Sequence, residues 1–159
     1  MTTRIRYALY IAVAIGALLG GLLLSFRSRR DRVQPQPPTT HQSIVITPTR
    51  ELPVSVADTP ALREQGLSYT ASLAAGTGKL FLFDTLGTPG FWMKGMEYSL
   101  DIVWIRDDWT VAAITPSLSP DTYPTIVYPP YLIQYVLEIN AGEAAKDGIV
   151  AGAQLKFEP

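Results

Sequence analysis

The amino-acid sequence predicts an α+β protein: a mostly antiparallel, barrel-like β-sheet with two short helices, preceded by one N-terminal transmembrane helix. Three observations support this. Residues 7–26 are apolar and uncharged, seven later runs are rich in β-branched and aromatic residues, and two brief helix signals interrupt those runs. The expected parts are a tail over 1–6, the transmembrane helix over 7–26, a basic stem and Pro-rich linker over 27–42 and one globular domain over 43–159.

The apolar segment 7–26 matches the length of a helix that crosses the hydrocarbon core of a membrane. A cleavable signal peptide is the alternative, but the segment runs into an arginine-rich stretch and not into a small-residue cleavage site. We therefore expect an uncleaved anchor. Small residues recur at every fourth position, Ala12, Gly16 and Gly20, which suits a homodimer through this face, although such residues are common in single spans.

The residues alone do not decide on which side of the membrane the domain lies. Two arginines precede the predicted span and four follow it, which by the positive-inside bias would keep the domain in the cytoplasm. The Pro-, Gln- and Thr-rich segment 33–42, by contrast, is typical of an extended spacer that holds a domain away from a membrane. The absence of Cys gives no information on the redox compartment.

Charge is unevenly distributed along the chain. Residues 1–42 hold six arginines and one acidic residue, whereas residues 43–159 hold seven basic and thirteen acidic residues, a formal charge of −6. Nucleic-acid binding needs clustered Lys and Arg, so we expect no nucleic-acid partner. The basic stem would lie against anionic lipid headgroups or act as an ordinary flanking anchor.

The domain is predicted to consist mainly of β-strands. One helix should begin after Asp58 or Thr59 as the N-cap, with Pro60 in its first turn and Gly66 at its end, and a second should cover 142–147. A turn over residues 107–109 should join two strands as a hairpin. The expected strands are 43–46, 54–57, 79–83, 99–106, 110–115, 134–140 and 154–157.

Two aromatic regions are candidates for a binding surface. Segment 115–131 contains five prolines and cannot be a central strand. We expect an ordered loop in which Tyr123, Tyr128 and Tyr131 either bind a ligand or cover an open end of the core. Trp92 and Lys94 place an aromatic face beside a cation, which suits sugars, acidic peptides or other anionic ligands.

The inventory of reactive side chains excludes several kinds of enzyme. The chain has no Cys, and its one histidine, His41, lies in the linker, so thiol nucleophiles, Ser-His-acid triads and histidine-bound metals in the domain are ruled out. Asp101 and Glu138 lie in apolar segments, and we expect Lys94 to pair with one of them. Such pairs are more often structural than catalytic. No metal and no cofactor is predicted.

An ordered set of motifs extends over nearly all of residues 43–157. It comprises Ala57-Asp58-Thr59-Pro60, Arg63, Gly66-Leu67, Lys79-Leu80-Phe81-Leu82-Phe83, Phe91-Trp92-Met93-Lys94, Leu100-Asp101-Ile102, Pro116, Tyr135-Val136-Leu137-Glu138-Ile139-Asn140-Ala141-Gly142, Gly148-Ile149 and Gly152. With these motifs the domain resembles the domain-of-unknown-function family 192. The resemblance implies a compact α+β domain around a mostly antiparallel, barrel-like sheet, often exported or membrane-anchored in prokaryotes, with no established activity. It therefore favours an extracytoplasmic domain.

The chain departs from the pattern of that family at several polar positions. Thr70 stands where the family has arginine, Gly95 where it has asparagine, Ser99 where it has proline and Ala153 where it has aspartate. If the family has a polar site made by that arginine, asparagine and aspartate, this chain lacks three of its parts. These departures argue against a catalytic site and against a tightly specific ligand site.

Three functions remain open. We prefer a membrane-anchored, non-catalytic binding module with a shallow cleft for a glycan, a cell-wall fragment or a peptide. The alternatives are a carboxylate-dependent hydrolase that uses Asp101 and Glu138, and a structural scaffold in which the side chain of Trp92 belongs to the core. The predicted ligand-binding residues are Trp92, Lys94, Asp101, Tyr123, Tyr128, Tyr131 and Glu138.

Overall fold

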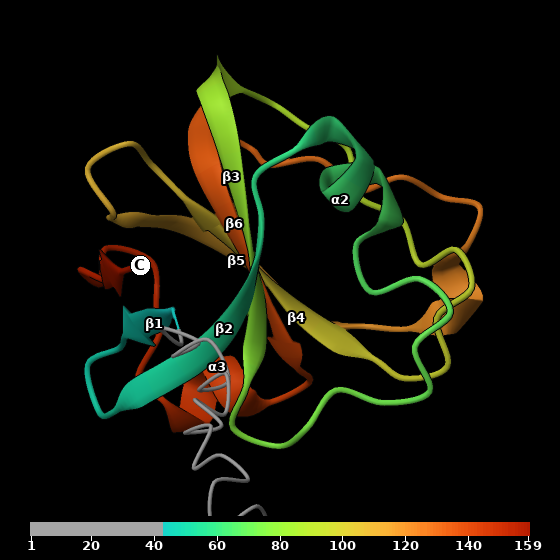
Figure 1. Ribbon diagram of the computed structural model, residues 1–159, viewed down its shortest axis with the longest axis horizontal. Coiled ribbons are helices and arrows are strands. Elements are labelled where there is room, and N and C mark those ends of the chain that lie inside the picture. The colour runs from blue at the N-terminus through green and yellow to red at the C-terminus, as the bar shows by residue number, and fades with distance from the viewer. Residues whose placement is uncertain (1–42) are drawn as a thin grey trace, which may run out of the picture. The chain divides into compact units, whose positions relative to one another are not determined.

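The computed structural model describes residues 43–159, which form a curled mixed β-sheet, a half-barrel, with two short α-helices (Figure 1). The strand order is β5-β4-β6-β3-β2-β1-β7, and every neighbouring pair is antiparallel except β2 and β3. The elements are β1 (Ile44–Ile46), β2 (Glu51–Ala57), α2 (Pro60–Gln65), β3 (Gly78–Gly87), β4 (Leu100–Ile105), β5 (Val111–Leu118), the 3-10 helix η1 (Pro120–Thr122), β6 (Ile133–Asn140), α3 (Glu143–Lys146) and β7 (Lys156–Glu158).

The predicted α+β class, the barrel-like sheet and both short helices are confirmed. Two strands extend through prolines that the sequence pattern treats as breakers. Pro53 lies in β2 just before Val54, where pairing with β3 begins, and Pro116 lies in β5, which is an edge strand. Proline is tolerated at such places because no ladder hydrogen bond needs its missing N–H.

The membrane-related predictions concern another part of the chain. Among residues 43–159, no helix is both long enough and apolar enough to cross a membrane. The predicted transmembrane helix 7–26, its small-residue face and the linker 27–42 lie outside the described residues.

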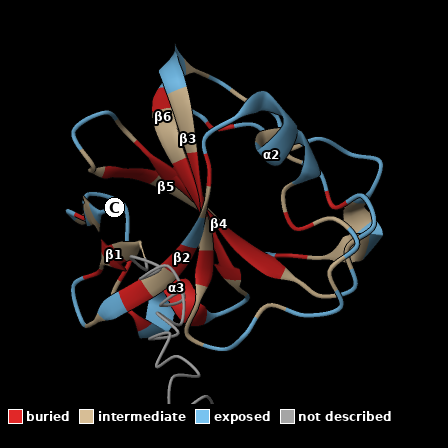
Figure 2. Cartoon of the chain, in the orientation of Figure 1, coloured by how far each residue is buried: buried red, intermediate tan, exposed pale blue. Residues whose placement is uncertain are grey.

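The sheet has two faces with separate apolar clusters. One cluster includes Leu80, Val103 and Leu137 and packs against Ala144 of α3, and we call this side the α3 face. The other cluster is built around Phe81, Trp104 and Val136, among others, and we call this side, near α2, the α2 face. Figure 2 shows the buried strand centres between largely exposed connections, including α2.

The pairing of β4 with β6 sends two acidic side chains to opposite faces. Asp101 stands opposite Ile139, which belongs to the α3 face, whereas Ile102 of the α2 face stands opposite Glu138. Because side chains alternate along a strand, Asp101 points to the α3 face and Glu138 to the α2 face.

Two local structures build the rim of the α2 face. Helix α2 begins at Thr59, whose side-chain oxygen accepts a hydrogen bond from the Leu62 N–H at 3.3 Å, and it ends at Gly66 in the left-handed region. The segment before Trp92 is held by two backbone hydrogen bonds between Phe91 and Val127, of 2.9 and 2.8 Å. The proline-rich loop thereby fixes the position of the aromatic segment.

Candidate functional site

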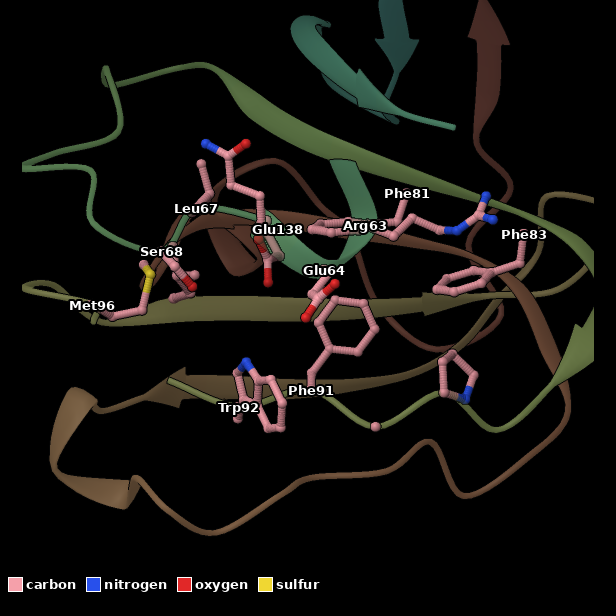
Figure 3. A pocket seen from close by; sticks show the side chains of 15 residues that line it. Arg63, Glu64, Leu67, Ser68, Phe81, Phe83, Phe91, Trp92, Met96 and Glu138 are labelled. Atoms are coloured by element: carbon pink, nitrogen blue, oxygen red, sulfur yellow. The ribbon is translucent and has the colours of Figure 1, made fainter. Parts of the chain in front are cut away.

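A cavity of about 190 Å³ opens on the α2 face, between α2, strands β3 and β6 and the segment that leads into Trp92 (Figure 3). Four aromatic side chains contribute to its walls, and its ionisable side chains come from α2 and β6. The residues that matter below are Arg63, Glu64, Phe81, Phe91, Trp92 and Glu138.

Glu138 is the buried polar group of this cavity. Its side chain is 6% exposed, and among residues 43–159 its Oε2 atom has no hydrogen-bond partner. Burial raises the pKa of Glu138 to about 8, and the charge of Lys79, its cross-strand neighbour, opposes this shift. At neutral pH the group is therefore mainly a neutral acid, which both donates and accepts hydrogen bonds. Figure 3 shows the carboxyl pointing into the space beside Phe91 and Trp92.

The Arg63 guanidinium is already occupied by neighbouring groups. Its Nη1 donates to the backbone carbonyl oxygens of Asp58 and Leu82 at 2.8 and 2.6 Å. Its Nη2 lies 3.5 Å from a carboxylate oxygen of Asp84, and its plane lies over the Phe83 ring at 5.4 Å. The guanidinium therefore ties α2 to β3 and is directed away from Glu138, as Figure 3 shows.

A second, more open hollow of about 320 Å³ continues from the cavity past Trp92. The Trp92 side chain is 44% exposed, and the Lys94 ammonium lies 5.9 Å from the centre of its ring. Tyr69 borders this hollow and donates its backbone N–H to the Gly95 carbonyl at 2.8 Å. Cavity and hollow form one cleft because they share Glu64, Gln65, Ser68 and Trp92.

Asp101 lies outside the cleft and has a structural role. Its Oδ1 accepts a hydrogen bond from the Ser117 N–H at 2.8 Å, and its Oδ2 accepts from the N–H groups of Gly142 and Ala144 at 2.9 and 3.0 Å. The last two belong to the start of α3, whose N-cap Gly142 has no side chain to cap it. Asp101 thus supplies from β4 the cap that α3 lacks.

The predicted pairing of Lys94 with Asp101 or Glu138 is wrong. Within the described part of the chain Lys94 forms no ion pair, and its ammonium faces the Trp92 ring. The cation beside Glu138 is Lys79, because the register of β3 and β6 places the two residues opposite each other.

The three loop tyrosines lie apart from the cleft lining. All are exposed at the surface, and none borders the cavity or the hollow. The Tyr128 ring packs close to Gly90 at the edge of the cavity, and the Tyr131 ring lies under the Arg106 guanidinium at 5.5 Å. Trp92 and Lys94 are therefore brought together, Glu138 joins Trp92, and Tyr123, Tyr128 and Tyr131 stay outside.

A partly buried ion cluster on the α3 side was not predicted from the sequence. Arg50 donates through Nε and Nη2 to the Asp147 carboxylate at 2.8 and 2.5 Å and through Nη1 to the Gly76 carbonyl at 3.0 Å. Glu143 accepts from the Gly76 N–H at 3.0 Å. Hydrogen bonding to Asp147 raises the pKa of Arg50 above its ordinary value. The cluster joins α3 to two loops, and among residues 43–159 no group of acidic or histidine side chains suits a metal ion.

Comparison with known families decides the relationship of this domain. Residues 43–157 match the model of DUF192, described as "Uncharacterized ACR". The chain belongs to the DUF192 family. None of the curated proteins compared with it matches.

Two solved structures resemble this DUF192 protein. The crystal structure of a "putative transcription regulator" from Sinorhizobium meliloti 1021 is 33% identical, with a TM-score of 0.67 over 73% of this chain and 92% of that one. The crystal structure of a protein of unknown function from Novosphingobium aromaticivorans DSM 12444 is 26% identical, with a TM-score of 0.66 over 76% of this chain and 89% of that one.

The departures from the DUF192 pattern do not gather at one site. Thr70 shares a hydrogen bond of 2.7 Å with the Tyr98 hydroxyl, and Gly95 lies under the Tyr69 ring, both near the α2 face. Ala153 instead packs with the cluster of the α3 face. A single polar site made from all three positions is therefore not supported by the geometry of this domain.

Proposed function

We propose that this DUF192 domain is a non-catalytic binding module whose cleft takes a small polar ligand, such as a sugar ring, a cell-wall fragment or a short peptide. The observation that carries the proposal is the position of Trp92, half exposed and shared by the cavity and the hollow. An exposed indole in a concave site offers a flat face for stacking, and such anchors are typical of binding sites.

The polar groups of the cleft suit a ligand with two different ends. Lys94 at the hollow would attract an acidic or hydroxyl-rich end. Glu138 in the cavity would form a hydrogen bond with the other end, which removes the cost of its unpartnered buried oxygen. The acidic charge of the domain and the absence of a basic cluster in the cleft argue against nucleic acid as the ligand.

Geometry weakens both alternative functions. A hydrolase based on Asp101 and Glu138 needs both carboxyl groups on one cleft, but they point to opposite faces and Asp101 is occupied by three backbone N–H groups. A pure scaffold role would place Trp92 in the core, whereas 44% of it is exposed.

Location is a separate part of the proposal. We propose that residues 7–26 anchor the protein in the membrane and that the domain lies outside the cytoplasm, on the basis of the apolar length of this segment and of the export that the family resemblance implies. Fractionation of membranes and protease treatment of intact cells test this. Recovery of the full-length protein in the soluble fraction, or protection of the domain from external protease, would contradict it.

Isothermal titration of the protein with a panel of glycans, cell-wall fragments and short peptides tests the binding function. Trp92→Ala should weaken any interaction at least tenfold. Tyr131→Ala is the matched control, because it removes an exposed aromatic side chain that does not line the cleft. Equal heats of binding for the wild type, Trp92→Ala and Tyr131→Ala would show that the cleft is not the binding site.

A further inference from the structure

The inner cavity has the size of a small chemical group and not of a whole ligand. Its volume of about 190 Å³ exceeds that of cavities of roughly 150 Å³ that accommodate a benzene ring. A group of about five to eight non-hydrogen atoms therefore fills it. The rest of the ligand would extend past Trp92 into the outer hollow.

The aromatic walls are held in fixed orientations. The Phe91 ring meets the Phe81 ring edge to face, with centres 5.0 Å apart, and meets the ring of the buried Trp104 in the same way at 5.5 Å. Trp92 closes the outer side. Ring faces carry negative electrostatic potential, so preorganised aromatic walls attract a positively charged group.

The ionisable groups around the cavity also favour a positively charged ligand group. Glu138 from β6 and Glu64 from α2 are lining acids, while the lining cation Arg63 is held by two backbone carbonyls and Asp84. Lys79 of β3 faces Glu138 across the strand pair but forms no ion pair with it within 43–159. Within the cavity lining, an anion would meet the carboxyl groups of the buried Glu138 and the exposed Glu64, whereas the cation Lys94 borders the adjoining hollow.

We infer that the cavity binds the ammonium group of a small amine, held beside the rings of Phe91 and Trp92 with the Glu138 carboxylate as its counter-charge. This inference rests on the proposed binding function and names the ligand class. It accounts for Oε2 of Glu138, which the fold leaves buried without a hydrogen-bond partner, because a cation beside this atom would supply a counter-charge.

Binding of a cation is coupled to release of a proton from Glu138. The empty site holds the proton because burial raises the pKa of Glu138 to about 8. The ion pair needs the carboxylate, so each ammonium that binds sends one proton to the solvent below this pH. The affinity should therefore rise with pH and level off once the pH exceeds the pKa.

Choline and its uncharged carbon isostere, 3,3-dimethylbutan-1-ol, have the same shape but differ in charge. A comparison of their affinities therefore shows whether the cavity recognises the positive charge. Choline keeps its charge at every pH, so titration of Glu138 alone moves its affinity. In calorimetric or NMR titrations of the full-length protein, choline should bind about 100-fold more tightly at pH 9 than at pH 6. The isostere should bind more weakly than choline at pH 9, and its affinity should not rise with pH.

Two variants test whether the pH-dependent binding of choline takes place in the cavity. Glu138→Gln should weaken choline binding at pH 9 at least tenfold and abolish the pH dependence, and Glu97→Gln, which removes an exposed acid outside the cavity, should change neither. Equal affinity for choline and its isostere, or choline binding that is unaffected by Glu138→Gln, would overturn the inference. Binding of the isostere as tightly as choline at pH 9, with a dependence on Trp92, would overturn it while leaving the proposed binding function intact.

Discussion

Asp101 and Glu138 are acidic residues on neighbouring strands of one sheet, and both are buried. On the α3 face, the Asp101 carboxylate accepts three backbone hydrogen bonds and caps α3. On the α2 face, Oε2 of Glu138 has no partner among residues 43–159, and the side chain borders a cavity. The same chemical group thus stabilises the fold on one face and is left available for a ligand on the other.

The difference comes from what each face packs against. The α3 face is covered by α3 and by a loop fixed through Arg50, so a buried acid there finds N–H donors. The α2 face is covered by a helix with no buried residue of its own, and a cleft remains between that helix and the sheet. A buried polar group without a partner is costly, so its presence beside a cleft points to function.

Removal of the Asp101 carboxylate should have the largest effect on the fold. Asp101→Ala removes the charged acceptor of three backbone hydrogen bonds, of which the one from Ala144 is buried and the other two are partly buried, and we expect a loss of about 4 kcal/mol in the free energy of unfolding. Urea unfolding followed by tryptophan fluorescence measures it. The exposed turn residue in Asp107→Ala is the control and should change stability by less than about 0.5 kcal/mol. A similar small loss for Asp101→Ala would contradict the structural role.

Substitution of Glu138, in contrast to that of Asp101, should raise the stability of the protein relative to the wild type as the pH rises. Between its ordinary pKa of 4.5 and its folded-state pKa of about 8, the folded protein holds a proton that the unfolded chain releases. Stability of the wild type should therefore fall as the pH rises through this window, by up to about 1.4 kcal/mol per pH unit. Glu138→Gln lacks this titration, so its stability relative to the wild type should increase by about 3 kcal/mol between pH 5 and pH 8. Parallel stability curves for the two proteins would show that Glu138 titrates normally.

Disruption of the ion cluster on the α3 side should cost less than loss of Asp101. Arg50→Ala leaves the buried Asp147 and Glu143 side chains without their cation, but the arginine is one-third exposed, so we expect a loss of about 2 kcal/mol. Arg50→Lys keeps the charge and loses the two-pronged geometry, and it should lie between the wild type and Arg50→Ala. Equal stability of the wild type and both variants in urea would show that the ion cluster does not stabilise the fold.

The smallest effect is expected at the outer end of the cleft. Gly95 has a backbone φ of +67°, and a side-chain carbon there would lie 2.7 Å from the Tyr69 ring. Gly95→Ala should therefore cost about 1 kcal/mol and move Tyr69 into the outer hollow. Weaker ligand binding without loss of the fold, measured by titration and by unfolding, would confirm that Tyr69 borders the site. Unchanged stability and binding would show that this end is unimportant.

The sequence pattern predicted the elements of the fold but not the direction of its polar side chains. Runs rich in β-branched and aromatic residues located all seven strands, and Thr59, Pro60 and Gly66 located α2. Whether a buried acid meets N–H donors or a cavity depends on strand register and on what covers each face. That information comes from contacts between segments 40 or more residues apart, as between Asp101 and the start of α3.

Prediction of the candidate site was partial for the same reason. Trp92 and Lys94 were identified because they are only two positions apart in the sequence and stay together in space. The pairing of Lys79 with Glu138 follows from register, and the contributions of Glu64 and Phe81 follow from the packing of α2 over the sheet. The only signal in the sequence for this part of the site was the capping pattern of α2, which predicts the helix but not that it packs over the sheet beside the cavity.

Carbon-13 NMR titration of the Glu138 carboxyl in the ligand-free protein tests the central claim most directly, because it follows the one group that distinguishes the α2 face from the α3 face. We expect a midpoint near pH 8, as for a carboxyl group that is buried and has an oxygen without a hydrogen-bond partner. A midpoint near the ordinary value of 4.5 would show that Glu138 is already solvated or paired, and would contradict the account.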